Sequence, residues 1–521
     1  LPSTVVFDYP SVGAMSGYIT SKMHPGVDDA EDCVIDKHKI ASGVQRAIIG
    51  VLGTSSRTAY DTLCTRNAVD TIACVPLARW CLDVPGDTTN LGARFGSFVS
   101  SVDQFDFDLF NVSFTEGVLL DPQQRMLLEA TWEATTDACR AKAPVQSGVT
   151  VGISGSEYGR MADNVSAYTA TGGALSVACG RISYTFGMQG ICMSVDTACS
   201  SSLVGSHIAI TSIVVGESDS VAAGGVNVTL NPMTSEMFSK AGMLSRDGRC
   251  KTLDSSADGY VRGEACVVFE ICSLTIMKTS LELHSSTLVA SAVNQDGRSS
   301  SLTAPNGPSQ QRVIRSCLGS AKTDPGAVDG LEMHGTGTPL GDPIEVGAAH
   351  AVLVEHTHDS RLTALVLSAM KSCMGHTEPA AGAVGLVNAV FGVGCSLVRP
   401  IVHLTGINPH LYNIAHNSGC GLTKAMALPR QQVATIVAAH DWPLHRGVSS
   451  FAFQGTNAHV LIAAPVSSSA GVAHRGRSST WHRMRLWIML VRHPMLQSAT
   501  VDLFSSSVHY EACIACNRQV Y

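Results

Sequence analysis

Three residues of the sequence, Cys199, His334 and His376, can do chemistry and are placed by their neighbours at the ends of predicted strands. Cys199 follows the apolar segment 191–195, which predicts a buried strand, and precedes the segment 202–215, which predicts a helix. A thiol at such a strand-to-helix turn lies beside the partial positive charge of a helix N-terminus. This charge can lower the pKa of a cysteine from about 8.5 toward 7, which favours the nucleophilic thiolate. A buried, inert cysteine is the alternative interpretation of Cys199 taken alone.

The two histidines occupy similar settings. His334 ends an apolar segment and is followed by the polar turn 335–338, and His376 lies between a predicted strand at 365–369 and a predicted helix at 380–390. Neutral imidazoles can donate hydrogen bonds to a developing oxyanion. A structural role and a metal site are the rival interpretations. The metal site is disfavoured because neither histidine has an HxxxH partner or a carboxylate at ligand spacing.

These residues need a scaffold that brings strand ends together. From Arg46 onward, short β-branched runs, glycines and helix-like segments alternate, which is typical of an α/β protein. The first strand is predicted at 47–52, and helices are predicted at 121–134 and from about residue 344. Strand, polar turn and helix recur at all three candidate residues. We therefore expect them at the carboxyl ends of strands, where open α/β sheets bind ligands.

Four sequence strings surround these residues or follow them along the chain. They are VDTACSSS at 195–202, EMHGTGTPLGDP at 332–343, KSCMGHT at 371–377 and GTNAH at 455–459, with lesser matches at 121–125, 257–260 and 293–297. Together they resemble the motifs of β-ketoacyl synthases of the modular type I polyketide synthase family, in the thiolase superfamily. The resemblance covers about residues 46–464 in the family's order and spacing, so it is far more specific than any single string.

The resemblance implies a β-ketoacyl synthase, an acyltransferase of the 3-oxoacyl-(acyl-carrier-protein) synthase type. An acyl group on Cys199 would condense with malonyl-acyl carrier protein in polyketide or fatty-acid elongation, and His334 and His376 would assist the loss of CO₂. The other implied roles are an oxyanion hole and gate at Cys199 and Phe453, a supporting pair of Lys371 and Glu345, and pantetheine contacts from Thr336 and Thr338. No metal or redox cofactor is expected, because the partner carrier protein brings the phosphopantetheine.

The implied fold is α/β and thiolase-like, with layers in the order α-β-α-β-α built from two similar halves, and a homodimer is expected. The N-terminal half at 46–280 would carry the nucleophile, and the C-terminal half at 281–465 would carry both histidines. Residues 1–45 are a poorly defined leader. Residues 466–521 are predicted to form a serine-containing linker and a basic tail.

The sequence departs from the family at a few positions. Ala452 and Gln454 stand where relatives usually carry small, flexible residues, often glycine. Ala265 and Val267 replace glycines expected after Glu264. We expect the methyl group of Ala452 to stiffen the gating loop and to change acyl selectivity.

Two other functions are alternatives to the condensing enzyme. One is a non-condensing ketosynthase that gates or transfers acyl intermediates, and the other is a structural partner subunit of a condensing heterodimer. Chains of either kind commonly lack the nucleophile or one histidine. This sequence has all three residues, which favours condensation.

Composition narrows the class of protein further. The chain has 521 residues, 45% of them hydrophobic, and its net charge of −7 argues against a general nucleic-acid binder. The 17 cysteines are irregularly spaced, which favours reduced thiols in an intracellular compartment, cytoplasmic or organellar. No apolar run reaches the roughly 18 residues of a membrane-spanning helix. No motif of an acyltransferase, carrier or nicotinamide-binding domain occurs, so we expect a lone ketosynthase or one cut from a longer chain.

Overall fold

The structure is a computed structural model. It describes residues 12–23, 49–59, 69–77, 79–80, 94–137, 146–160, 166–273, 286–355, 357, 363–411, 426–429, 434–435, 444–464 and 484–485. Most of the predicted linker and tail lies outside these residues.

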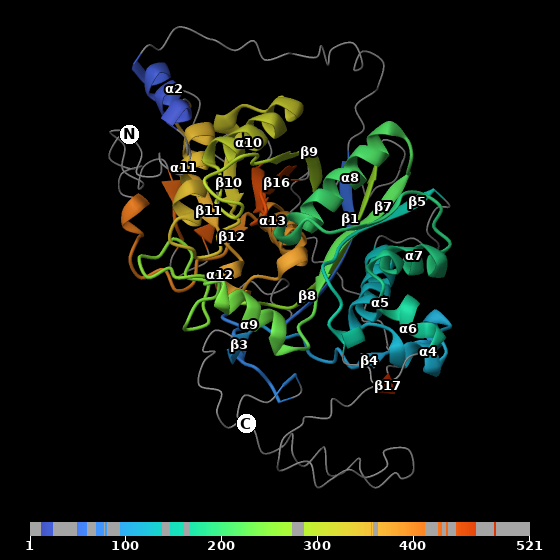
Figure 1. Ribbon diagram of the computed structural model, residues 1–521. Coiled ribbons are helices and arrows are strands. Elements are labelled where there is room, and N and C mark those ends of the chain that lie inside the picture. Colours follow the sequence, from blue (N-terminus) through green and yellow to red (C-terminus); the bar gives the residue numbers. More distant parts are fainter. Residues whose placement is uncertain are drawn as a thin grey trace, which may run out of the picture.

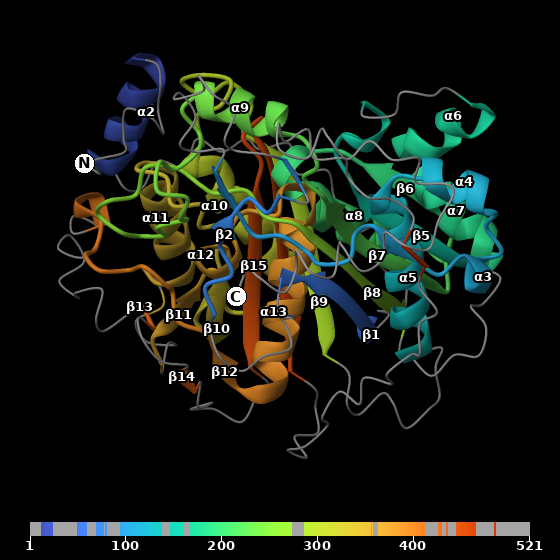
Figure 2. The same cartoon turned by 90° about the horizontal axis from the view of Figure 1, so that it is seen from below.

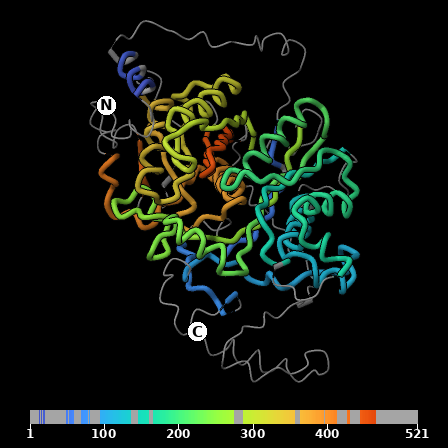
Figure 3. Tube along the Cα trace, in the orientation of Figure 1, coloured from blue at the N-terminus to red at the C-terminus, as the bar shows by residue number. Residues whose placement is uncertain are grey.

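One sheet of eleven strands runs through the described part of the chain, in the order β13-β11-β10-β15-β16-β9-β1-β8-β7-β5-β6. Figure 3 shows that the last of these strands in sequence, in red-orange, lies at the centre of the molecule. The bounds are β1 Ile49–Thr58, β5 Ser147–Gly152, β6 Cys192–Val195, β7 Ser220–Asn227, β8 Ala265–Ser273, β9 Thr287–Gln295, β10 Val328–Glu332, β11 Leu365–Ser368, β13 Met426–Ala427, β15 His445–Phe451 and β16 Thr456–Ala463.

The sheet repeats one pattern of strand pairing. In the order β1-β8-β7-β5-β6, the first two pairs are antiparallel and the next two are parallel. The order β9-β16-β15-β10-β11 shows the same succession of pairings. The two sets meet where β1 pairs with β9, through Ile49 with Leu288 and Gly50 with Thr287. The sheet therefore consists of two similar halves.

Helices form three layers around the two half-sheets. Helices α5 and α7 pack on β1, β8, β5 and β6 of the first half, and α10 packs on β9 and β16 of the second half, beside α11. Helices α8 and α13 contact each other and lie between the two halves (Figures 1 and 2). Their bounds are α5 Pro122–Asp137, α7 Leu175–Phe186, α8 Ser201–Val215, α10 Gly307–Ala321, α11 Gly341–Leu353 and α13 Ala381–Cys395. This is the predicted α-β-α-β-α arrangement.

Shorter elements complete the described part of the chain. The helices among them are α2 Val12–Met23, α3 Phe107–Phe110, α4 Phe114–Leu119, α6 Ala167–Gly173, α9 Pro232–Lys240 and α12 Lys371–Met374. The strands are β2 Ala73–Cys74, β3 Phe95–Gly96, β4 Gln104–Phe105, β12 Leu397–Val398, β14 Ala434–Thr435 and β17 Met484–Arg485. Helix α2 falls in the predicted leader, and β17, from the predicted tail, pairs with β4.

The central helix α8 is largely apolar. The segment Ala198–Val215 is long and apolar enough to cross a membrane by length and composition, but more than half of it is buried inside the structure. It packs against β5, β7 and α13, so its apolar surface is that of a core helix.

Two predicted strands differ from the observed ones. The first strand continues beyond residue 52 to Thr58, because Ser55 and Arg57 both hydrogen-bond Glu133 of α5 while the backbone pairs with β8. The prediction that the strand at 191–195 is buried is wrong. This strand is the edge strand β6, where Cys192 is exposed and Met193 is 46% exposed. Ala265 and Val267, which replace the expected glycines, are fully buried in β8.

Candidate active site

Cys199 lies in a sharp turn between β6 and α8. Ala198, just before it, has a left-handed backbone with φ of 53°, which is uncommon for a residue with a side chain. The Asp196 carboxylate accepts the Ala198 N–H at 3.0 Å, and the Ser201 hydroxyl accepts the Thr197 N–H at 2.9 Å. These polar contacts stabilise the turn that sets the thiol at the N-terminus of α8.

The structure brings the three predicted reacting groups together. The Sγ atom of Cys199 and a ring nitrogen from each of His334 and His376 all lie within 4.8 Å of one another. The two imidazole rings stand 5.5 Å apart, edge to face. Cys199 follows β6 of the first half-sheet, whereas His334 follows β10 and His376 follows β11 of the second. Both half-sheets therefore contribute to one site.

His376 is held in one tautomer. Its Nδ1 accepts the backbone N–H of Glu378 at 3.1 Å, so the ring proton is on Nε2. Glu378 reaches this position with a left-handed φ of 48°, and Gly375 precedes the histidine with φ of 71°. Among the described residues Nε2 is buried and has no hydrogen-bond partner. A free N–H of this kind suits an oxyanion, whereas a metal ion would need the lone pair that the proton occupies.

The segment 261–263, which the sequence analysis missed, holds the segment that carries His376. The backbone of His376 donates to Val261 at 2.7 Å and accepts from Gly263 at 2.8 Å. Between them, the Arg262 guanidinium makes two bonds of 2.6 and 3.0 Å to Glu378. The string at 257–260 pointed to this region, but the pairing of Arg262 with Glu378 spans the two halves and leaves no local signal.

The turn after His334 is fixed by carboxylates. Glu345 on α11 accepts the backbone N–H groups of His334 at 2.6 Å and Gly335 at 2.9 Å. Asp342, at the start of the same helix, accepts the Gly337 N–H at 3.2 Å. Glu345 therefore orients His334 through its backbone.

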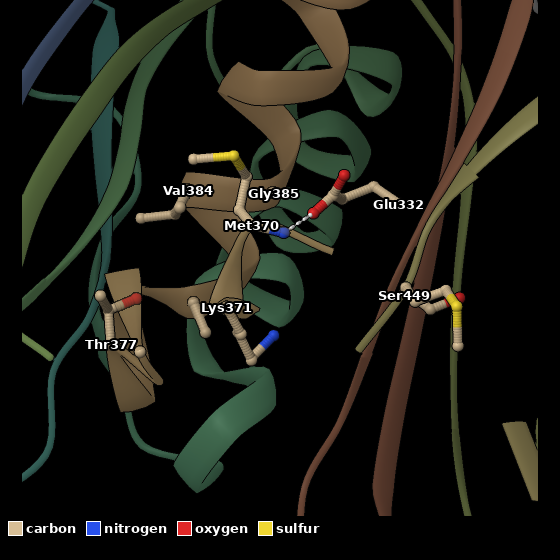
Figure 4. A pocket seen from close by; sticks show the side chains of 10 residues that line it. Glu332, Met370, Lys371, Thr377, Val384, Gly385 and Ser449 are labelled. Carbon is tan, nitrogen blue, oxygen red and sulfur yellow. Dashed lines mark hydrogen bonds between the residues drawn. The ribbon is translucent and has the colours of Figure 1, made fainter. Parts of the chain in front are cut away.

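Lys371 is buried beside two carboxylates. Burial lowers the pKa of Lys371, and the charges of Glu332 and Glu345 oppose this lowering, Glu332 more strongly. Lys371 and Glu332 line the same small pocket (Figure 4). Glu332 accepts the Met370 N–H at 2.7 Å and the Asn388 amide at 2.9 Å, so it fixes the residue next to Lys371. The sequence predicted the influence of Glu345 but not that of Glu332.

The β15–β16 turn contributes backbone to the thiol. The N–H groups of Phe453 and of Cys199 itself are directed at the thiol and favour the thiolate by lowering its pKa. The Ser450 hydroxyl donates to the Cys199 carbonyl at 2.7 Å and fixes the end of β15 to the nucleophile turn. The ring of Phe453 is 42% exposed. The arrangement can supply two N–H donors to a tetrahedral oxyanion.

The predicted pantetheine contacts differ in accessibility. Thr336 is 9% exposed, and Thr338 is half-buried. Gly335 lies between His334 and Thr336, and its carbonyl accepts a hydrogen bond from the Thr252 hydroxyl at 2.8 Å. The turn is therefore well ordered, and Thr338 is the more accessible of the two hydroxyls.

Burial dominates the electrostatics of the site. It raises the pKa of the Cys199 thiol to about 11, Glu378 adds to the rise, and Lys371 opposes it. The pKa near 7 expected from a helix N-terminus is thus wrong for the free site, because desolvation outweighs the favourable contacts. Burial, then Lys371, lowers the pKa of both His334 and His376 well below the usual 6.5. Both imidazoles are neutral at pH 7.

Known proteins have the same fold and are similar in sequence. Residues 54–275 match the family model described as the N-terminal domain of beta-ketoacyl synthase, and residues 285–405 match its C-terminal domain. The ketosynthase from module 6 of the bacillaene synthase of Bacillus subtilis superposes with a TM-score of 0.71 at 30% identity, over 80% of this chain and 72% of that chain. An oxazolomycin ketosynthase domain from Streptomyces albus gives 0.70 at 27% identity, over 81% and 75%.

These structures are ketosynthases of thiolase-like fold. Curated relatives include erythronolide synthase EryA2 of Saccharopolyspora erythraea, 35% identical over 91% of this chain and 13% of that protein. A phenolphthiocerol/phthiocerol polyketide synthase of Mycobacterium tuberculosis is 38% identical over 77% of this chain and 18% of that protein. The chain spans less than a fifth of these relatives. It belongs to the β-ketoacyl synthase family, as a ketosynthase of the modular polyketide synthase type.

Proposed function

We propose that this chain condenses an acyl group held on Cys199 with a malonyl group on an acyl carrier protein, by decarboxylative Claisen condensation. The observation that carries the proposal is the meeting of the thiol with two neutral imidazoles within 4.8 Å, one of which presents a free, buried N–H. Chemistry that forms an enolate needs this kind of donor.

The first step transfers the acyl group. The Cys199 sulfur attacks the carrier thioester carbonyl, the N–H groups of Cys199 and Phe453 hold the oxyanion, and the carrier leaves as its thiol with the Cys199 proton. Because the free thiol has a raised pKa, its proton must leave as the carbon–sulfur bond forms. The neutral ring of His334 can accept it in passing, because the acceptor nitrogen of His376 is already occupied by the Glu378 N–H.

The second step makes the new carbon–carbon bond. Malonyl-carrier loses CO₂, and the electrons of the broken bond become an enolate whose oxygen accepts hydrogen bonds from the two histidines. The enolate carbon attacks the acyl-Cys199 carbonyl, and Cys199 departs as a thiolate that regains a proton. The product is a β-ketoacyl thioester extended by two carbons.

The partners follow from this reaction. The carrier would bring phosphopantetheine, with Thr338 as the accessible contact and Thr336 behind it. The relative from Mycobacterium tuberculosis is named as a polyketide synthase, which supports a polyketide rather than a fatty-acid product. We propose no metal cofactor, because the Glu378 N–H occupies the Nδ1 lone pair of His376 and leaves the ring proton on Nε2. We propose no redox cofactor, because the condensation needs no external oxidant or reductant.

A homodimer is part of the proposal. Strand β6 ends the sheet, and its first residues Cys192 and Met193 are exposed together with Tyr184 of α7, which is 90% exposed. An apolar edge strand of this kind can pair with another strand. Pairing of β6 with the β6 strand of a second copy would cover this edge in both subunits through one symmetric contact.

Intact-mass spectrometry tests the catalytic proposal. The protein is incubated with an acyl thioester, with Cys199→Ala as the control, and malonyl-carrier is then added with and without a chelator. We expect an acyl adduct in the wild type only, followed by a β-keto product whose rate the chelator does not change. Acylation without extension would favour the non-condensing function. No acylation of folded protein would favour a structural role in a heterodimer.

A further inference from the structure

The turn that carries Phe453 has few fixed points of its own. It joins β15 to β16 over residues 452–455, and its backbone bonds run from Ala452 N–H to the Thr456 carbonyl at 2.9 Å and from Gly455 N–H to the Ala452 carbonyl at 2.8 Å. Both bonds stay within the hairpin, whereas the Asp296 N–H, just after β9, donates to the Gly455 carbonyl at 2.9 Å. Phe453 itself is 42% exposed, so its burial holds the turn only in part.

The side chain of Gln454 links this turn to other segments. Its Nε2 donates to the Thr197 carbonyl at 3.3 Å, in the nucleophile turn. Gln295, the last residue of β9, donates to the Gln454 Oε1 at 3.4 Å and to its backbone carbonyl at 3.3 Å. The Thr456 N–H donates to the same Oε1 at 3.2 Å. A glycine at this position would keep the bond from Gln295 to the backbone carbonyl but would lose the bond to Thr197 and both bonds to Oε1.

Two side chains of the hairpin therefore hold the nucleophile turn on both sides of Cys199. Ser450 binds the Cys199 carbonyl at 2.7 Å, and Gln454 binds the carbonyl of Thr197, two residues earlier. Phe453 lies between Ser450 and Gln454 along the chain. Its N–H is the group that must stay at the thiol.

We propose that Gln454 is a positioning residue, which holds the backbone N–H of Phe453 at Cys199 by binding the turn to the carbonyl of Thr197. The inference rests on the proposed function, because this N–H serves catalysis only if Cys199 is acylated. Gln454 touches no reacting atom. Without it the turn keeps its backbone bonds to the end of β9 but loses its bond to the carbonyl of Thr197. A displaced N–H then stabilises the tetrahedral oxyanion less.

The test compares Gln454→Met with wild type. Methionine keeps the length and neutrality of glutamine but cannot form these hydrogen bonds. Gln311→Met, at a half-buried position of α10, makes the same change away from the site. Gln454→Ala is the second variant, in case the thioether packs badly. One measurement is the rate of Cys199 alkylation by iodoacetamide against pH, and the other is kcat and KM for acylation of Cys199.

We expect both Gln454 variants to shift the alkylation profile to higher pH, because the Phe453 N–H lowers the pKa of the thiol. Acylation should lose about three- to tenfold in kcat, the worth of one hydrogen bond, with little change in KM. Gln311→Met should match wild type. Unchanged profiles and kcat in folded Gln454 variants would overturn the proposal. A shifted profile in protein that no thioester acylates would support the positioning role and refute the proposed function instead.

Discussion

Among single residues, His376 shows most clearly how burial and one backbone contact decide chemistry. Its Nδ1 is occupied by the Glu378 N–H, and its Nε2 proton is left without a partner in the described part of the chain. Burial keeps the ring neutral, so the donor is present before substrate arrives. A protonated ring would donate at both nitrogens and would clash with the Glu378 N–H.

The lowered histidine pKa values predict that the rate of decarboxylation changes little between neutral and mildly acid pH. An ordinary histidine of pKa about 6.5 would be about nine-tenths protonated at pH 5.5, whereas burial lowers the pKa of His334 and His376 well below 6.5 and so opposes their protonation there. We expect decarboxylation of a malonyl thioester to keep most of its pH 7.5 rate at pH 5.5. A decline with a midpoint near 6.5, in protein that circular dichroism shows to be folded, would contradict the assignment.

The lowered histidine pKa values also affect the free energy of unfolding, which they reduce at acid pH. Below about pH 6.5 the unfolded chain binds protons that the folded histidines refuse, so the free energy of unfolding falls as pH falls toward the folded pKa values. Buried His459, whose pKa burial lowers to about 4, adds to this loss between about pH 6.5 and 4. The activity must therefore be measured above the acid unfolding transition.

At the scale of elements, the short link between α12 and α13 positions His376. Gly375 has φ of 71° and ψ of −174°, and a Cβ there would lie 2.9 Å from the Val261 carbonyl. We expect Gly375→Ala to destabilise the protein by about 1–3 kcal/mol and to slow decarboxylation more than acylation, because Cys199 lies on a different element. Gly394→Ala, at an exposed position of α13 with open space, should be neutral or slightly stabilising. Thermal melting and the two partial reactions check this, and equal losses in both reactions would contradict it.

Elements also separate what the sequence predicts from what it does not. Strands and helices next to Cys199, His334 and His376 appear within a few residues of their predicted bounds, because their local pattern is strong. The exposure of β6 was missed, since an apolar strand looks the same at an edge as in the core. The raised pKa of Cys199, the Arg262–Glu378 pair and the contacts of Gln454 depend on segments distant in sequence. No local pattern encodes them.

At the scale of the whole molecule, the exposed edge of the sheet predicts the state of assembly. We expect a homodimer by size-exclusion chromatography with light scattering, and a shift toward monomer in Met193→Lys, because lysine on an edge strand opposes pairing. Met237→Lys, which charges an exposed position of α9 instead, should leave the mass unchanged. A monomeric wild type at micromolar concentration would contradict the dimer.

The repeated order of strands has a consequence for ancestry. Each half-sheet packs one central helix against its counterpart, α8 against α13, and each of these helices begins beside the site. Such an arrangement is what two identical subunits would form around a twofold axis, before fusion into a single chain let the copies diverge. In the present chain the two halves divide the labour, because the first carries Cys199 and the second carries both imidazoles. Neither half alone holds a complete set of reacting groups.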